Sequence, residues 1–315
     1  MVSATKMRRA QEVALLSRPY AIEALRILRE LSIRAGGYLP AIMMPRDPST
    51  TLRADAKGIR KTALVLIVAD RGLAGSFNTN VFRQFEKYIT KNNGNPSTGS
   101  SASSGLAQGL SDRYIFISVG KKAEEFLNRK GVAIHKSFKG FGDYANPEEV
   151  QPLTSLLVSG FLKGEWDAAT VISTHFRSTL RQDVMVREIL PINGAKLMDV
   201  IKEVVPEYGR YSENNKNSSG SASFEANQNF EYLIEPDPKE VMDALAPELV
   251  EVVLYDFLLE ANASEHSARM VAMKNASENA AELKEELTRE YNKTRQAAIT
   301  REISEIVGGA EALQT

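Results

Sequence analysis

Residues 248–307 read ELVEVVLYDFLLEANASEHSARMVAMKNASENAAELKEELTREYNKTRQAAITREISEIV, a stretch without glycine or proline. Because these two residues are the strongest breakers of helices, the stretch predicts one long helix. Pro247 suits a first helical turn, and Gly308-Gly309 should stop the helix. Such a helix would be ~90 Å long at 1.5 Å per residue. No domain of this size can bury both ends of it, so part must be exposed or surrounded by other chains.

The long helix carries small or apolar residues at alternating steps of three and four, the spacing of a coiled-coil seam. An extra residue between Leu287 and Tyr291 is a stutter, which locally unwinds a supercoil. The charges around the seam are mixed in sign. They suit either a solvated coiled-coil face or a face that meets charged loops of a surrounding ring. The seam positions are Ala276, Ala280, Leu283, Leu287, Tyr291, Thr294 and Ala298.

The N-terminal region shows the same spacing over residues 5–35, and Gly36-Gly37 should end its helix. An antiparallel coiled coil of the two terminal helices is the simplest way to bury both seams. The N-terminal seam consists of Met7, Ala10, Ala14, Ser17, Ala21, Ala24, Leu28, Leu31 and Ala35.

Between the two helices the pattern changes to that of an alternating α/β domain. The run TALVLIVAD at residues 62–70 is typical of a strand buried on both faces. The predicted fold is therefore α/β: a Rossmann-like, mostly parallel sheet domain flanked by long N- and C-terminal helices. Further strands are predicted at 114–119, 133–138 and 168–174, and helices at 79–90, 121–129 and 147–163.

Three regions follow from this pattern. We expect an N-terminal coiled-coil helix at 1–37, an α/β domain at 60–235 and a long C-terminal coiled-coil helix at 239–315. Two stretches rich in Ser, Gly and Asn, 91–112 and 212–227, should form surface loops inside the α/β domain. Their composition offers too little apolar area to offset the entropy of ordering.

Composition excludes several classes of function. A net charge of −1 over 315 residues argues against a nucleic-acid binder. The chain has no cysteine, which removes disulfides, thiolate metal sites and cysteine nucleophiles together. The longest apolar stretch, residues 63–69, is the size of a strand, so we expect attachment to a membrane only through a partner protein.

The turn Asp70–Asn78, DRGLAGSFN, follows a strand and precedes a helix, where doubly wound folds often bind phosphate. It matches neither glycine-rich phosphate motif, so a tight structural turn is the stronger interpretation. His135, His175 and His266 fall in three different elements, which argues against a metal site. No residue set nominates catalysis, and no cofactor is expected.

Four motifs resemble the gamma-subunit family of rotary ATP synthases. They are MVSATKMRRAQ at 1–11 with SRPYA at 17–21, DRGLAGSFN at 70–78, YLIEPDP at 232–238, and the segment 263–312. The last contains ASEHSARMVAMKNASENA and YNKTRQAAITREISEIVGGAEAL. Together the motifs span the chain in the family's order.

The resemblance implies a non-catalytic central stalk, or rotor. Such a subunit turns inside a ring of alpha and beta subunits and couples ion flow through the membrane c-ring to the cycling of the beta-subunit catalytic sites. It also implies an epsilon subunit packed on the α/β domain. The expected location is peripheral, on the cytoplasmic face of a bacterial plasma membrane.

The resemblance also suggests which residues meet partners. Arg295, Gln296 and Thr300 match the family segment that faces the beta-subunit loops. Tyr232 and Glu235 match the foot segment that docks near the c-ring and epsilon. The guanidinium of Arg295 and the amide of Gln296 are suitable donors for carboxylates. Tyr232 could equally well be an aromatic residue packed in a strand.

Two alternative functions would require different sequence features. A nucleotide-dependent enzyme with coiled-coil extensions would need a phosphate-binding loop. A static coiled-coil scaffold would need no residues that contact a specific partner.

Family members usually carry a further helical segment before the first motif. We therefore expect the native chain to begin upstream of Met1, with a basic helical segment pairing the region of Leu287–Ile303.

Overall fold

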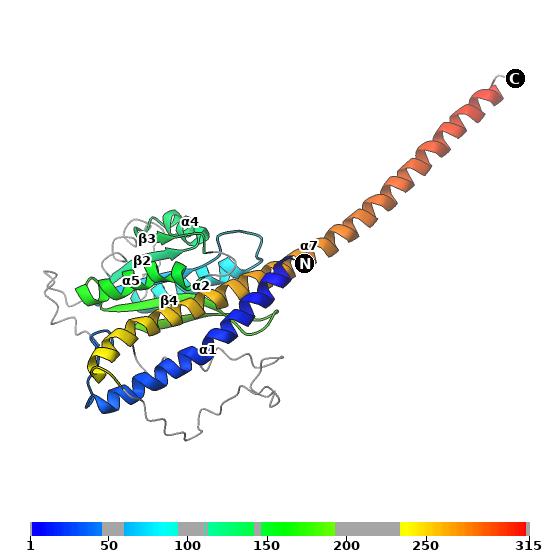
Figure 1. Cartoon of the computed structure of the whole chain (residues 1–315). Helices are drawn as coiled ribbons and strands as arrows, with labels where there is room; N and C mark the ends of the chain where they lie inside the picture. The colour runs from blue at the N-terminus through cyan, green and yellow to red at the C-terminus, as the bar shows by residue number, and fades with distance from the viewer. Residues whose placement is uncertain are drawn as a thin grey trace. The chain divides into compact units, whose positions relative to one another are not determined.

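The structure is a computed structural model that describes residues 2–45, 60–93, 110, 113–141, 146–192 and 234–312 (Figure 1). The chain divides into two compact units, Met1–Met270 and Val271–Thr315. The first unit contains the sheet and the helices that cover it. The second is formed by the later part of the C-terminal helix.

The first unit is built on a five-stranded sheet with strand order β3-β2-β1-β4-β5. The first four strands are parallel, with Val65 of β1 aligned to Ile117 of β2 and to Val171 of β4. β5 runs antiparallel to β4. The predicted α/β class with a mostly parallel sheet is confirmed. The strands are β1 Thr62–Ile67, β2 Tyr114–Val119, β3 Ile134–Phe138, β4 Ala168–Phe176 and β5 Gln182–Leu190.

Successive residues of β1 belong to opposite faces of the sheet, as the period of a strand requires. Val65 and Ile67 join a large buried cluster with residues of α5 and α7. Leu64 and Leu66 join a second cluster with residues of α2 and α4. The apolar run of β1 is thus buried on both faces. The covering helices are α2 Phe77–Asn93, α4 Lys121–Arg129, α5 Pro147–Lys163 and α7 Pro238–Ala312.

The N-terminal helix α1 covers Val2–Arg34, and Gly36 and Gly37 follow with φ of 63° and 82°. Left-handed glycines of this kind end helices, as predicted. The predicted seam positions that the structure describes are buried or half-buried. They are Met7, Ala10, Ala24, Leu28, Leu31 and Ala35.

Helix α7 is longer at both ends than the stretch 248–307 that lacks glycine and proline. It begins at Pro238, so Pro247 lies inside the helix and not in its first turn. It also continues through Gly308 and Gly309 to Ala312, which makes the predicted stop wrong. Glycine lowers helix stability by only about 1 kcal/mol relative to alanine, too little to end a helix already formed.

Two further predictions need correction. Residues 91–93 are the last turn of α2 and not part of a loop. Strand β5 was not predicted, because its sequence QDVMVREIL intersperses charged residues among apolar ones and lacks a clean alternation. Pairing with β4 is what makes it a strand. The predicted loop at 212–227 lies outside the described residues.

Candidate functional site

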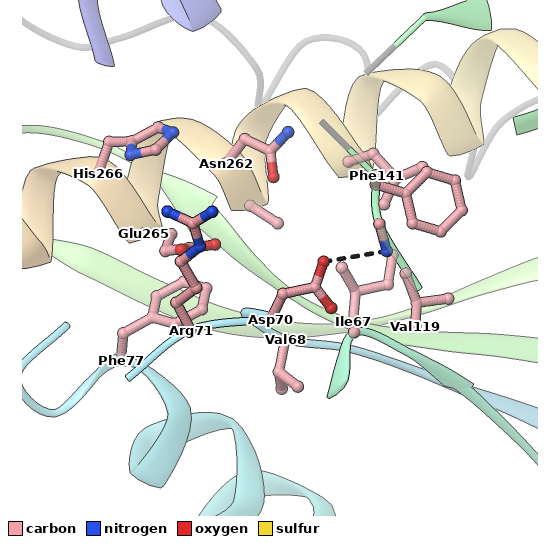
Figure 2. A pocket seen from close by; sticks show the side chains of 14 residues that line it. Ile67, Val68, Asp70, Arg71, Phe77, Val119, Phe141, Asn262, Glu265 and His266 are labelled. Atoms are coloured by element: carbon pink, nitrogen blue, oxygen red, sulfur yellow. Dashed lines mark hydrogen bonds between the residues drawn. The ribbon is translucent and has the colours of Figure 1, made fainter. Parts of the chain in front are cut away.

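The carboxyl ends of β1 and β2 face α7 across a cavity of about 220 Å³ (Figure 2). Sites in doubly wound folds form at the carboxyl ends of strands, but ligand pockets usually measure about 300–1,000 Å³. Two of the lining side chains, Asp70 and Glu265, are carboxylates. Arg71 lines the same cavity, so it is chiefly the small volume that makes this cavity a poor receptor for a polyphosphate.

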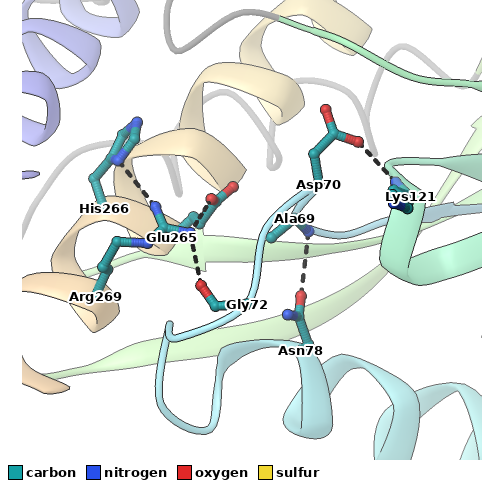
Figure 3. Close-up of polar contacts among 8 residues, drawn as sticks. All are labelled: Ala69, Asp70, Gly72, Asn78, Lys121, Glu265, His266 and Arg269. Carbon is teal, nitrogen blue, oxygen red and sulfur yellow. Dashed lines mark hydrogen bonds and ion pairs between the residues drawn. The ribbon is translucent and has the colours of Figure 1, made fainter.

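Asp70 is the central polar residue of the turn after β1 (Figure 3). Its Oδ1 accepts a hydrogen bond from the backbone N–H of Lys121 at 2.7 Å, and its Oδ2 accepts one from Gly140 at 3.0 Å. Lys121 is the first residue of α4, where a carboxylate is favoured by the positive end of the helix dipole. Asp70 thus ties β1 to α4 and to the loop after β3.

The rest of the turn is held by its own backbone and by Asn78. The Oδ1 atom of Asn78 accepts a hydrogen bond from the backbone N–H of Ala69 at 3.2 Å. Leu73 has a φ of 62° and is 77% exposed. The side chains of Asp70 and Asn78 therefore accept hydrogen bonds from backbone N–H groups, which suits a structural turn.

One turn of α7 contacts this motif through Arg269. Its Nη2 donates to the carbonyl of Gly72 at 3.3 Å and to Oε1 of Glu265 at 2.6 Å. Its Nη1 lies 3.4 Å from Nδ1 of His266 (Figure 3). Residues from the second and fourth family-like motifs, far apart in sequence, therefore meet here.

A buried ionic cluster joins α7 to the sheet. Oε1 of Glu260 lies 2.9 Å from Nδ1 of His175 in β4, and Oε2 accepts a hydrogen bond from Nη1 of Arg187 in β5 at 3.1 Å. All three side chains are 4% exposed. Burial opposes ionisation of Glu260, but the hydrogen bonds and charges of His175 and Arg187 outweigh it and hold the pKa of this carboxyl below its usual value.

The sequence did not reveal this cluster. We expected His175 to stand alone, and no spacing rule connects residues 73 and 85 positions apart. The available signal was a glutamate on the apolar face of a long helix, because such a charge requires a partner. Among the described residues, no group of three or more His, Cys, Asp or Glu side chains is arranged to hold a metal ion.

The predicted partner residues fall in both units. Arg295, Gln296 and Thr300 are exposed on consecutive turns of α7 in the second unit. Glu235 is exposed just before α7 begins. Tyr232 lies outside the described residues.

The second unit keeps apolar side chains in solvent. Leu283, Leu287 and Tyr291 are 56%, 55% and 66% exposed, and Ile303 and Ile306 are 56% and 69% exposed. No helix in the described part of the chain combines the length and apolar character needed to cross a membrane. Large apolar residues repeated along an exposed helix mark a surface for other protein chains.

The chain thus combines an α/β sheet domain with a 75-residue helix that exposes apolar residues, an arrangement typical of proteins that bind other chains. Residues 1–313 match the model of the ATP synthase family. The chain is 37% identical to the ATP synthase gamma chain of Roseiflexus castenholzii over 99% of its own length and 90% of the relative's. The chain belongs to the ATP synthase gamma-chain family.

Other comparisons agree. The gamma chain of Moorella thermoacetica is 36% identical over 100% of this chain and 91% of its own length. Among solved structures, a chain of the Euglena gracilis mitochondrial ATP synthase aligns over 99% of this chain and 93% of its own, with a TM-score of 0.52 and 17% identity. That likeness concerns the fold.

Proposed function

We propose that this chain is the central rotor stalk of an ATP synthase. It couples ion flow through a membrane c-ring to conformational cycling of catalytic beta subunits and has no active site of its own. The observation that carries the proposal is the exposed apolar surface of α7 in a chain of the gamma family. An isolated helix with this surface gains stability only when other chains cover it.

The second unit is the part that meets the alpha and beta subunits. Its exposed face offers the guanidinium of Arg295 and the amide of Gln296 beside apolar residues such as Tyr291 and Ile299. Directional donors next to apolar area suit beta-subunit loops that carry carboxylates. Thr300 lies on the next turn and completes this contact.

The first unit forms the foot. Glu235 is exposed at the start of α7 and, with Tyr232, is the proposed contact for the c-ring loops and the epsilon subunit. The complex holds the chain peripherally on the cytoplasmic face of a bacterial plasma membrane. Attachment is through partners, consistent with the absence of a membrane-crossing helix among the described residues.

The two terminal helices pair as an antiparallel coiled coil. Leu28 and Leu31 of α1 belong to the same buried cluster as Val253 and Phe257 of α7. The hydroxyl of Tyr38, just after α1, donates to the carboxylate of Asp243 near the start of α7 at 3.0 Å. These contacts support a pairing in which α1 ends where α7 begins. In this proposal the N-terminal helix is formed by 1–37, the α/β foot by 60–235 and the shaft by 239–315.

Photo-crosslinking in the assembled complex tests the rotor assignment. A benzophenone amino acid at Leu287 or Ile303 should crosslink to alpha and beta subunits, because both side chains are more than half exposed in the free chain. The control places the same group at Lys136, which is exposed on the edge strand β3. It should not give the crosslinked products with alpha and beta subunits that positions 287 and 303 give. Crosslinks at 287 and 303 to no alpha or beta subunit would refute the assignment.

Activity provides the second arm of the test. Membranes that lack their own gamma chain should regain ATP-driven proton pumping when they receive this chain. Binding to the ring with no gain of pumping would favour a static scaffold. An ATPase activity of the isolated chain would favour the enzyme alternative.

A further inference from the structure

We infer that Glu260 is a positioning residue that sets the rotational and axial register of α7 on the sheet. The inference rests on the proposed rotor function, since register matters most in a helix that carries torque. Its two carboxylate oxygens contact two different strands, His175 in β4 and Arg187 in β5. One side chain of the helix is therefore held from two directions.

The contact between α7 and the sheet changes character along the helix. Up to Leu258 the buried α7 residues that face the sheet are apolar, such as Val253 and Phe257. From Glu260 onward the buried residues include Ser264, His266 and Ser267. Apolar packing is non-directional, so the first part resists separation without specifying an angle. The polar part supplies the directional contacts.

The chemistry of the cluster penalises any other register. The Nε and Nη2 atoms of Arg187 have no acceptor in the described part of the chain, so Glu260 provides the acceptor of this buried guanidinium. The guanidinium also stacks over the ring of Phe257, 4.6 Å from its centroid. A slide of α7 by one turn, about 5.4 Å, would replace the Glu260 carboxylate by the hydroxyl of Ser264 or by the Asp256 carboxylate, which is one methylene group shorter. A rotation by one residue would bring Leu259 or Ala261 there and leave a buried charge unpaired.

Stability alone does not account for the cluster. Replacing a buried ionic set by apolar residues of similar size is often neutral for stability, whereas its directionality can specify a register. Neighbouring contacts continue the restraint on the same face. The hydroxyl of Ser267 donates to the carbonyl of Thr179 in the β4–β5 turn at 2.7 Å, and Nε2 of Gln182 donates to that hydroxyl at 3.5 Å.

The test separates positioning from stability. The triple variant His175→Leu, Arg187→Met, Glu260→Met removes the charges together, so its thermal midpoint should stay close to that of the wild type. In complexes rebuilt with the variant, ATP hydrolysis should continue while the ratio of protons pumped to ATP hydrolysed falls. Glu248→Gln, an exposed carboxylate on the same helix, is the matched control and should keep the wild-type ratio.

Register is measured directly in the isolated full-length chain. The protein has no cysteine, so spin labels at Glu165→Cys and Glu251→Cys report one distance between α7 and the turn before β4. We expect one narrow distance distribution in the wild type and a broadened or shifted one in the triple variant. This measurement does not depend on assembly, so it tests the positioning role even if the rotor assignment fails.

The outcomes are decisive in each case. A wild-type pumping ratio and a wild-type distance distribution in the folded triple variant would overturn the inference. If the triple variant does not fold, Glu260→Gln, which keeps the size of the side chain, is measured in the same two ways with the same criterion. Failure of the wild-type chain to restore pumping would count against the rotor assignment and not against the register.

Discussion

Gly160 of α5 lies directly against the indole ring of Trp166. A Cβ atom at position 160 would stand 2.1 Å from both Cη2 and Cζ2 of that ring. The indole cannot move away easily, since it is fully buried and its Nε1 donates to the carbonyl of Leu157 at 3.1 Å. The close approach of α5 to the start of β4 therefore depends on the missing side chain.

Gly160→Ala should destabilise the first unit by about 3 kcal/mol, because a methyl group at this distance forces helix and indole apart. Urea denaturation followed by fluorescence of Trp166, the single tryptophan, would measure the change. Gly72→Ala is the control, since no atom lies within 4 Å of a Cβ there; its effect should be within about 0.5 kcal/mol. Equal unfolding midpoints for the two variants would contradict the packing argument.

Asp70→Ala should destabilise the protein by about 1–2 kcal/mol, since it removes the acceptors of the Lys121 and Gly140 backbone N–H groups. Asp70→Asn keeps one acceptor and should lose less. Thermal melts of the two variants give the order. If alanine were tolerated better than asparagine, the hydrogen bonds would not be what holds the turn.

Glu260→Gln should change the acid limb of the stability curve. The folded-state pKa of Glu260 is lowered from 4.5, so the carboxylate stabilises the fold above the ordinary carboxyl pKa. That contribution disappears as pH falls through the lowered value. At pH 7 the variant should be less stable by about 2–3 kcal/mol. As the pH falls below the ordinary carboxyl pKa, the two proteins should converge. The urea midpoints of both proteins are measured over this pH range. A difference between them that stays constant at all pH values would show that Glu260 does not titrate as argued.

Arg295→Ala and Gln296→Ala should leave the fold intact and impair coupling. Both side chains are exposed on α7, so each change should alter the free energy of unfolding by about 0.5 kcal/mol or less. ATP synthesis by rebuilt complexes is the functional readout. Exposed Lys293→Ala, two positions earlier, serves as the comparison. Loss of the folded state in thermal melts would assign Arg295 and Gln296 a structural role instead.

The isolated chain should bind no ATP with useful affinity. Both carboxylate oxygens of Asp70 already accept backbone hydrogen bonds, and Glu265 adds a second negative side chain to the cavity. Titration calorimetry with ATP and Mg²⁺ on the pure protein is the measurement. A micromolar dissociation constant would contradict this prediction and make the Asp70–Asn78 turn a candidate phosphate-binding site.

Local patterns in the sequence were sufficient for most of the elements. The run at β1 and the glycines after α1 each act within a few residues, so spacing and residue type predict them. The buried positions of α1 that the structure describes could be predicted for the same reason, because helical periodicity indicates which side chains face inward. The motifs alone also indicated the family.

Contacts between distant residues could be decided only by the tertiary structure. β5 is a strand because β4 offers it a paired edge, and α7 continues through Pro247 and the final glycines because the rest of the helix outweighs their cost. Glu260, His175 and Arg187 meet only once β4, β5 and α7 are packed together. Their separation in sequence carries no signal, whereas burial of a carboxylate requires that such partners exist.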